Sequence, residues 1–292
     1  MDSISPSTFP EDPITRTERV KLSDIVYGAA VGDAVGVPYE GFGRDMFVCT
    51  GMDGYGNHNQ PAGTFSDDTS MTLALCDSIR ACEGSINIDD MRERFRAWLN
   101  RGEYTSAPTA FGIGRTTMIA LDQGFGLSNE RSNGNGSLMR TLPLALTAAT
   151  DAQIRAVSAI THAHPLSEEA CVLAVAIARV LIEGRSLEEA LSTLSVHNAE
   201  LSRVPYILDY SRDDISSSAF VVSTLEAALW CLGRSSSFEE CVLEAVNLGG
   251  DSDTTACVAG AYAGILYGKE GIPLEWLEDL RGKDIIERCL FA

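Results

Sequence analysis

Residues 28–36 read Gly-Ala-Ala-Val-Gly-Asp-Ala-Val-Gly and stand inside a longer apolar stretch with helical spacing. Gly28, Gly32 and Gly36 are four residues apart, so in a helix they leave three bare backbone patches on one face. A glycine inside a helix costs about 1 kcal/mol relative to alanine, and something must offset that cost. We interpret the stripe as the face on which a second helix packs closely, with close approach of a ligand as the alternative. Asp33 lies on a neighbouring face.

Helical periodicity continues along most of the chain, whereas alternating period-2 runs are scarce. No linker and no internal repeat divides the sequence. We therefore predict an all-α fold, with a poorly ordered arm over 1–18 and one domain over 19–292. The stretches with apolar residues at helical spacing are 22–37, 68–82, 88–100, 108–123, 138–149, 151–160, 166–183, 187–195, 217–232, 237–246 and 253–267.

Composition excludes several classes of protein. The chain has 292 residues, 45% of them hydrophobic and 22% charged, which is far from the composition of a disordered chain. The formal charge of −19 and the lack of Lys/Arg clusters argue against a nucleic-acid partner. The N-terminus lacks a signal-peptide pattern, and no apolar run is long enough to span a membrane. The eight cysteines include no CxxC pair, so we expect free thiols in a reducing cytoplasm.

Two acidic clusters each follow a glycine and directly precede a helical stretch. They read Gly63-Thr-Phe-Ser-Asp-Asp-Thr69 and Gly249-Gly-Asp-Ser-Asp-Thr-Thr255. Helix capping accounts for one or two acids at each place. The alternative is a metal site, because four closely spaced carboxylates balance the charge of two divalent cations. Hard oxygen ligands suit Mg²⁺ or Mn²⁺ rather than zinc. An EF-hand is excluded, since Ala256 and Tyr262 stand where that loop needs Gly and Glu.

A third motif, Asn133-Gly-Asn-Gly-Ser-Leu-Met-Arg140, runs into a helical stretch. Small residues before a helix expose backbone N–H groups to an anion, although an ordinary Asn-Gly turn is the alternative. The motif is not a dinucleotide fingerprint, because Met139 occupies the third glycine position. His162 could contact a ligand, whereas His58 has no evident role. The chain has no GxSxG sequence, so chemistry would depend on metal and carboxylates.

Four blocks in this order resemble the ADP-ribosylglycohydrolases. They are Gly28–Gly36, Ser66-Asp-Asp-Thr-Ser-Met71, Gly134-Asn-Gly-Ser-Leu-Met-Arg140 and Gly249–Thr255, and together they span nearly the whole chain. The resemblance implies a single compact, orthogonal multi-helix domain with a cleft that holds two divalent ions, Mg²⁺ or Mn²⁺. It also implies a monomer.

The resemblance assigns roles to individual residues. The implied metal ligands are Ser66, Asp67, Asp68, Asp251, Asp253 and Thr254. The implied substrate contacts are Asn133, Gly134, Asn135, Gly136, Ser137 and Leu138, around the diphosphate of ADP-ribose, together with His162. Asp68 or Glu40 is the implied general acid or base.

The implied reaction is hydrolysis of the C1″ glycosidic bond, which removes ADP-ribose from a modified protein side chain. Two alternatives stay open. One is hydrolysis of small conjugates such as O-acetyl-ADP-ribose, and the other is a non-catalytic ADP-ribose-binding protein. The acceptor residue and the choice between Mg²⁺ and Mn²⁺ are not determined by the sequence.

Overall fold

The computed structural model describes residues 19–292, so the arm predicted over 1–18 lies outside the described residues. The described chain is helical, as predicted, and its β-structure consists of three isolated bridges. The α-helices are α1 (Leu22–Gly36), α2 (Asp67–Ala81), α3 (Ile88–Arg101), α4 (Arg115–Gln123), α5 (Asp151–Ser158), α6 (Pro165–Ile182), α7 (Leu187–Ser192), α8 (Val221–Arg234), α9 (Phe238–Asn247), α10 (Ser252–Tyr267), α11 (Leu274–Asp279) and α12 (Lys283–Cys289).

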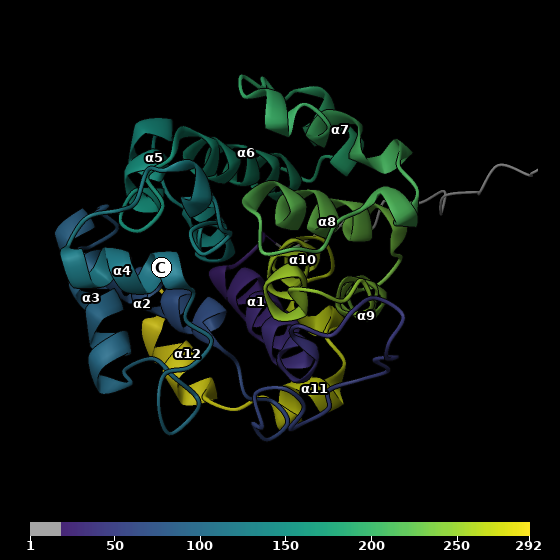
Figure 1. Ribbon diagram of the computed structural model, residues 1–292, viewed down its shortest axis with the longest axis horizontal. Coiled ribbons are helices and arrows are strands. Elements are labelled where there is room, and N and C mark those ends of the chain that lie inside the picture. The colour runs from purple at the N-terminus through teal and green to yellow at the C-terminus, as the bar shows by residue number, and fades with distance from the viewer. Residues whose placement is uncertain (1–18) are drawn as a thin grey trace, which may run out of the picture.

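Helices α1 and α10 pack side by side in the middle of the molecule (Figure 1). The glycine stripe is the contact face. A Cβ added to Gly28 would lie 2.2 Å from the carbonyl oxygen of Gly260, and one added to Gly32 would lie 2.0 Å from that of Ala256. Only glycine allows this approach, so the packing interpretation of the stripe is confirmed. The tight contact also brings the C-terminal end of α1 against the N-terminal end of α10.

The other helices surround this central pair. Helices α8 and α9 pack on α10, whereas α2 packs on α1 and is itself covered by α3 and α12. Helix α6 runs between α5 and α7 and also contacts α8 and α10 (Figure 1). Because α2 and α10 both begin near the C-terminal end of α1, the two acidic clusters at their N-termini meet.

The structure corrects some expected boundaries. Residues 138–149 do not form one α-helix but two short 3₁₀ helices, Leu138–Arg140 and Leu142–Leu146. Pro143 lacks a backbone N–H and stands at the second position of the second piece, which prevents a continuous α-helical ladder. Helix α4 begins seven residues later than expected, at Arg115. The short helices α11 and α12 were not predicted, because six or seven residues give too few turns for a periodic signal.

The structure also describes the thiols and the apolar character of the helices. All eight cysteines are free thiols, and seven of them are buried. Across residues 19–292, no helix has both the length and the apolar character needed to cross a membrane.

Candidate active site

The two acidic clusters occupy the first turns of α2 and α10. Ser66 is the N-cap of α2, and its hydroxyl accepts a hydrogen bond from the Asp68 N–H at 3.3 Å. The capping interpretation is therefore confirmed for this residue. Asp251 is the N-cap of α10 but makes no side-chain capping bond. Capping thus does not account for the carboxylate of Asp251.

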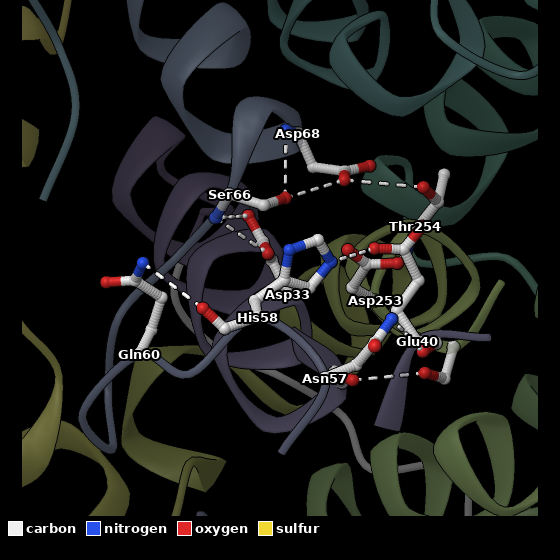
Figure 2. A network of polar contacts seen from close by, with 11 residues as sticks. Asp33, Glu40, Asn57, His58, Gln60, Ser66, Asp68, Asp253 and Thr254 are labelled. Atoms are coloured by element: carbon white, nitrogen blue, oxygen red, sulfur yellow. Dashed lines mark hydrogen bonds and ion pairs between the residues drawn. The ribbon is translucent and has the colours of Figure 1, made fainter. Parts of the chain in front are cut away.

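Three carboxylates from three helices converge at this point. Asp33 of α1, Asp68 of α2 and Asp253 of α10 each offer an oxygen within 4.8 Å of the others (Figure 2). The Thr254 hydroxyl donates to Asp68 Oδ2 at 3.3 Å, and the Ser66 hydroxyl donates to the same oxygen at 2.9 Å. The two sequence motifs therefore form one site.

The electrostatics of the cluster favour a bound cation. Burial raises the pKa values of the Asp67, Asp68 and Asp253 carboxyls well above the usual range, and the neighbouring carboxylates raise them further. Burial also raises the pKa of Asp33 to about 6 and that of Asp251 above its usual value. Like charges this close and this buried cannot all ionise without a compensating positive charge.

The donor set fits one or more hard divalent cations. Asp68 Oδ1 is buried and has no hydrogen-bond partner among residues 19–292. An orphaned carboxylate oxygen is costly unless a ligand satisfies it. The remaining candidates in the cluster are carboxylate and hydroxyl oxygens, which are the ligands that Mg²⁺ and Mn²⁺ prefer.

Asp33 was not predicted as a site residue, but it organises the site. Its carboxylate is fully buried and accepts hydrogen bonds from the N–H groups of Ser66 and Thr69, each at 3.0 Å, and from the Thr69 hydroxyl at 2.6 Å. It thereby ties the start of α2 to α1. A signal was present in the sequence, since a charged residue inside an apolar, glycine-striped helix needs a buried polar partner.

Glu40 lies at the edge of the cluster, just after α1. Its Oε2 atom pairs with Nε2 of His58, and these two side chains form a second acidic group with Asp253 (Figure 2). The pairing with Glu40 raises the pKa of His58. Both side chains keep some exposure, 30% for Glu40 and 22% for His58. His58 was missed because no local pattern around it marks a functional role.

The loop 133–138 lies beside the acidic cluster and is joined to it by Asn135. The Asn135 amide donates to Asp251 Oδ2 and, at 2.8 Å, to the Thr224 hydroxyl. The backbone N–H groups of Gly136, Ser137 and Leu138 donate to no acceptor within residues 19–292. Three successive N–H groups without an internal acceptor can donate to a bound anion.

Three of the residues predicted to contact substrate have side chains that are engaged within the fold. The Ser137 side chain is fully buried, and its hydroxyl bonds to that of Ser158 at 2.9 Å. Leu138 is also fully buried. The Asn133 side chain accepts from the Ser167 hydroxyl at 2.9 Å and donates to a backbone carbonyl, so its amide is engaged within the fold.

His162 lies directly against this loop. A Cβ added to Gly136 would lie 2.8 Å from His162 Cε1, and one added to Gly134 would lie 3.5 Å from Nε2. The ring is almost completely buried. The structure therefore places together the acidic cluster, Glu40, the loop and His162.

Comparison with known proteins identifies the family of the chain. The family described as ADP-ribosylglycohydrolase matches residues 14–292. The chain is 34% identical to a protein named ADP-ribosylarginine hydrolase Tri1 from Serratia proteamaculans, over 89% of this chain and 75% of that one. It is 33% identical to ADP-ribosyl-(dinitrogen reductase) glycohydrolase of Rhodospirillum rubrum, over 87% of each chain. A solved structure titled "ADP-ribosylglycohydrolase-related protein complex" superposes with a TM-score of 0.77 at 29% identity, over 92% of this chain and 95% of that one. This chain belongs to the ADP-ribosylglycohydrolase family.

Proposed function

We propose that the protein is a metal-dependent hydrolase that releases ADP-ribose from ADP-ribosylated arginine side chains of proteins. Removal of ADP-ribose from a modified acceptor follows from the family. The arginine linkage is supported by the relatives that are 34% and 33% identical to this chain and are named for ADP-ribosylarginine. Hydrolysis of small ADP-ribose conjugates is the alternative outcome of the experiment below.

One observation carries the proposal. A loop with three free backbone N–H groups stands next to a buried acidic cluster, and Asn135 bonds directly to Asp251. A ligand that bridges the two must carry an anionic group at one end and cation-binding hydroxyls at the other. ADP-ribose meets both requirements, because its diphosphate is anionic and its distal ribose carries hydroxyls.

The carboxylates of Asp67, Asp68, Asp251 and Asp253 would hold two divalent cations, with the hydroxyls of Ser66 and Thr254. When bound, such ions neutralise the cluster and polarise the oxygens of the ribose and of water. Asp33 would hold the first turn of α2 in place through its bonds to Ser66 and Thr69. The loop would fix the diphosphate, so that remote binding energy positions the sugar.

Cleavage at C1″ passes through a transition state that resembles an oxocarbenium ion. Glu40 fits the proton-transfer role better than Asp68. It retains exposure at the edge of the cluster, and its partner His58 holds the carboxylate in a defined orientation. Asp68 is fully buried and already bonded to two hydroxyls. We therefore assign Asp68 to the metal centre and Glu40 to general acid–base catalysis.

The test is release of ADP-ribose, measured by mass spectrometry, from matched arginine-linked and serine-linked peptides. Each reaction is run with Mg²⁺, with Mn²⁺ and with EDTA. We expect metal-dependent release from the arginine-linked peptide and little from the serine-linked one. Asp68→Asn is the inactive control, and retained helical circular dichroism shows that it is folded.

Other outcomes separate the alternatives. Release from the serine-linked peptide alone would refute the arginine linkage. Failure on both peptides, with turnover of O-acetyl-ADP-ribose, would assign a small conjugate as substrate. Binding of ADP-ribose without any turnover would refute the enzymatic function.

Two further expectations belong to this proposal. Free, mostly buried thiols support action in the reducing cytoplasm. A monomer is expected by analogy with the family, and light scattering after size-exclusion chromatography tests it.

A further inference from the structure

Arg140 is a buried cation with no salt-bridge partner among residues 19–292, although the negative charge of Asp67 acts on it. Its side chain is fully buried. Nη1 donates to the carbonyl of Gly136, Nη2 donates to the Thr161 hydroxyl at 2.8 Å, and the guanidinium lies 4.7 Å from the centre of the Phe95 ring. Burying a cation in this way is unfavourable. Arg140 therefore contacts both the loop 133–138, at Gly136, and Thr161, the residue that precedes His162.

The bond between Arg140 and Thr161 determines where the threonine proton lies. A guanidinium has only donors, so Thr161 Oγ1 accepts from Arg140. The Thr161 hydroxyl is fully buried, and its other polar neighbour is Nδ1 of His162, at 2.8 Å. Its proton is therefore directed to Nδ1, because a second acceptance, from an Nδ1–H group, would leave the buried hydroxyl proton without an acceptor. A ring nitrogen that accepts a hydrogen bond carries no proton, so the proton of the neutral imidazole stands on Nε2.

The Nε2 atom lies on the edge of the ring that borders the loop 133–138. It has no hydrogen-bond partner within residues 19–292, yet it is not among the buried atoms sealed from solvent. Gly134 and Gly136 both lie against this edge of the ring. A side chain at Gly136 would collide with the ring, so the small residue keeps this edge next to the free N–H groups of the loop.

We propose that Arg140 and Thr161 lock His162 in the neutral tautomer with its proton on Nε2, so that His162 provides one fixed N–H donor to an anionic oxygen at the loop. Arg140 and Thr161 are positioning residues, and His162 binds the ligand without transferring a proton. The identity of the anion as the diphosphate of ADP-ribose rests on the proposed function. The tautomer itself does not.

The charge environment agrees with this assignment. Burial, together with the positive charge of Arg140, lowers the pKa of His162 to about 3. The imidazole is therefore neutral near pH 7. The loop thus gains a directional donor whose strength does not vary with physiological pH. A histidine that titrated near pH 7 would instead make binding pH-dependent.

The direct test is the tautomer in the metal-loaded full-length protein labelled with ¹⁵N-histidine. The chain has four histidines, so each long-range ¹H–¹⁵N pattern can be assigned with the aid of His162→Asn. We expect His162 to show the Nε2–H pattern alone, unchanged from about pH 5 to about pH 8. An Nδ1–H pattern, or titration within that range, would overturn the proposal without the need for any variant.

Threonine variants test the lock. Thr161→Val removes the hydroxyl at nearly constant volume, and we expect a mixture of tautomers and ADP-ribose affinity lowered by about tenfold or more. Thr161→Ser keeps the hydroxyl and should restore both. Thr141→Val is the matched control, because it removes an equally buried hydroxyl that bonds to the Ser137 carbonyl and not to His162. It should keep the Nε2–H pattern.

These readouts distinguish an error in the tautomer of His162 from an error in the proposed function. A wild-type protein with the Nε2–H tautomer but no affinity for ADP-ribose would support the lock and refute the proposed function. A Thr161→Val protein that is folded, as judged by thermal melting, and keeps both tautomer and affinity would refute the lock alone.

Discussion

The Thr254 hydroxyl donates a hydrogen bond to Asp68 Oδ2 at 3.3 Å, although the two residues are 186 positions apart in sequence. This bond joins the first turns of α10 and α2. It depends on the close packing of α1 against α10, because Gly36 leaves room for the backbone of Asp253, only 2.4 Å from where a Cβ would stand. The glycine stripe that organises the fold thus also assembles the acidic cluster.

The first prediction concerns Asp68→Asn. In EDTA the variant should melt about 2 °C higher than the wild type or more, because it removes one ionisable carboxyl from a group that is costly to bury together. It should also lose the stabilisation by Mg²⁺ or Mn²⁺, with activity lowered at least about a hundredfold. Thermal melts with and without metal measure both effects. A variant that melts lower in EDTA but keeps its response to metal would assign Asp68 a purely structural role.

The second prediction is the pH dependence of stability without metal. A carboxyl whose pKa is raised on folding binds more protons in the folded than in the unfolded protein. The free energy of unfolding therefore increases as pH falls through the raised pKa. For Asp33 this window runs from about 6 down to its usual value near 4. The other raised carboxyls act in the same direction.

Denaturant titrations in EDTA at pH 7, 6 and 5 should show this increase, and saturating Mg²⁺ should abolish it. His162 acts oppositely, because its lowered pKa makes the folded protein bind fewer protons below about pH 6.5. That contribution is common to both series, so the difference between EDTA and Mg²⁺ reports on the carboxyls of the cluster together with His58, whose raised pKa acts in the same direction. Identical slopes in both series would show that the cluster does not bind the metal.

The third prediction tests the helix contact. Gly32→Ala should lower the free energy of unfolding by more than about 2 kcal/mol, because its Cβ would meet the Ala256 carbonyl at 2.0 Å and neither backbone can move independently. Gly51→Ala is the control, since its Cβ would meet Trp276 at 3.8 Å, an ordinary contact. Urea denaturation measures both. Equal stabilities of the two variants would contradict the close packing of α1 on α10.

The contact face of α1 was predictable because three glycines at helical spacing weaken a helix unless a close neighbour compensates for them. The sequence also predicted that Ser66 could cap a helix and that the two acidic motifs could form one site. Asp33 and His58 were not assigned. Their roles arise from chain segments that meet only in three dimensions, and a single acid or histidine carries little local signal. The 3₁₀ pieces over 138–146 were missed because their apolar spacing resembles that of an α-helix, whereas Pro143 decides the hydrogen bonding.

The fourth prediction concerns the anion loop. Gly136→Ala would place a methyl group 2.8 Å from His162 Cε1 and 3.0 Å from the Thr117 hydroxyl. The ring or the loop must shift, so we expect ADP-ribose affinity to fall by about tenfold or more. Calorimetry measures the affinity. The increase in melting temperature on adding metal should persist, because the acidic cluster is untouched, and its loss would show that the variant disturbs the whole site.

The last prediction separates Glu40 from Asp68. Glu40→Gln keeps the shape of the side chain but cannot exchange a proton, so kcat should fall by about a hundredfold or more, while affinity for ADP-ribose and the response to metal are retained. His58→Gln removes the ring that orients Glu40. We expect a smaller loss of kcat, and almost no further loss when it is added to Glu40→Gln, because the two side chains act as one unit. If Glu40→Gln retains kcat while Asp68→Asn is inactive, proton transfer belongs to the buried cluster and not to its edge. If the losses from Glu40→Gln and His58→Gln multiply, His58 contacts the substrate independently of Glu40.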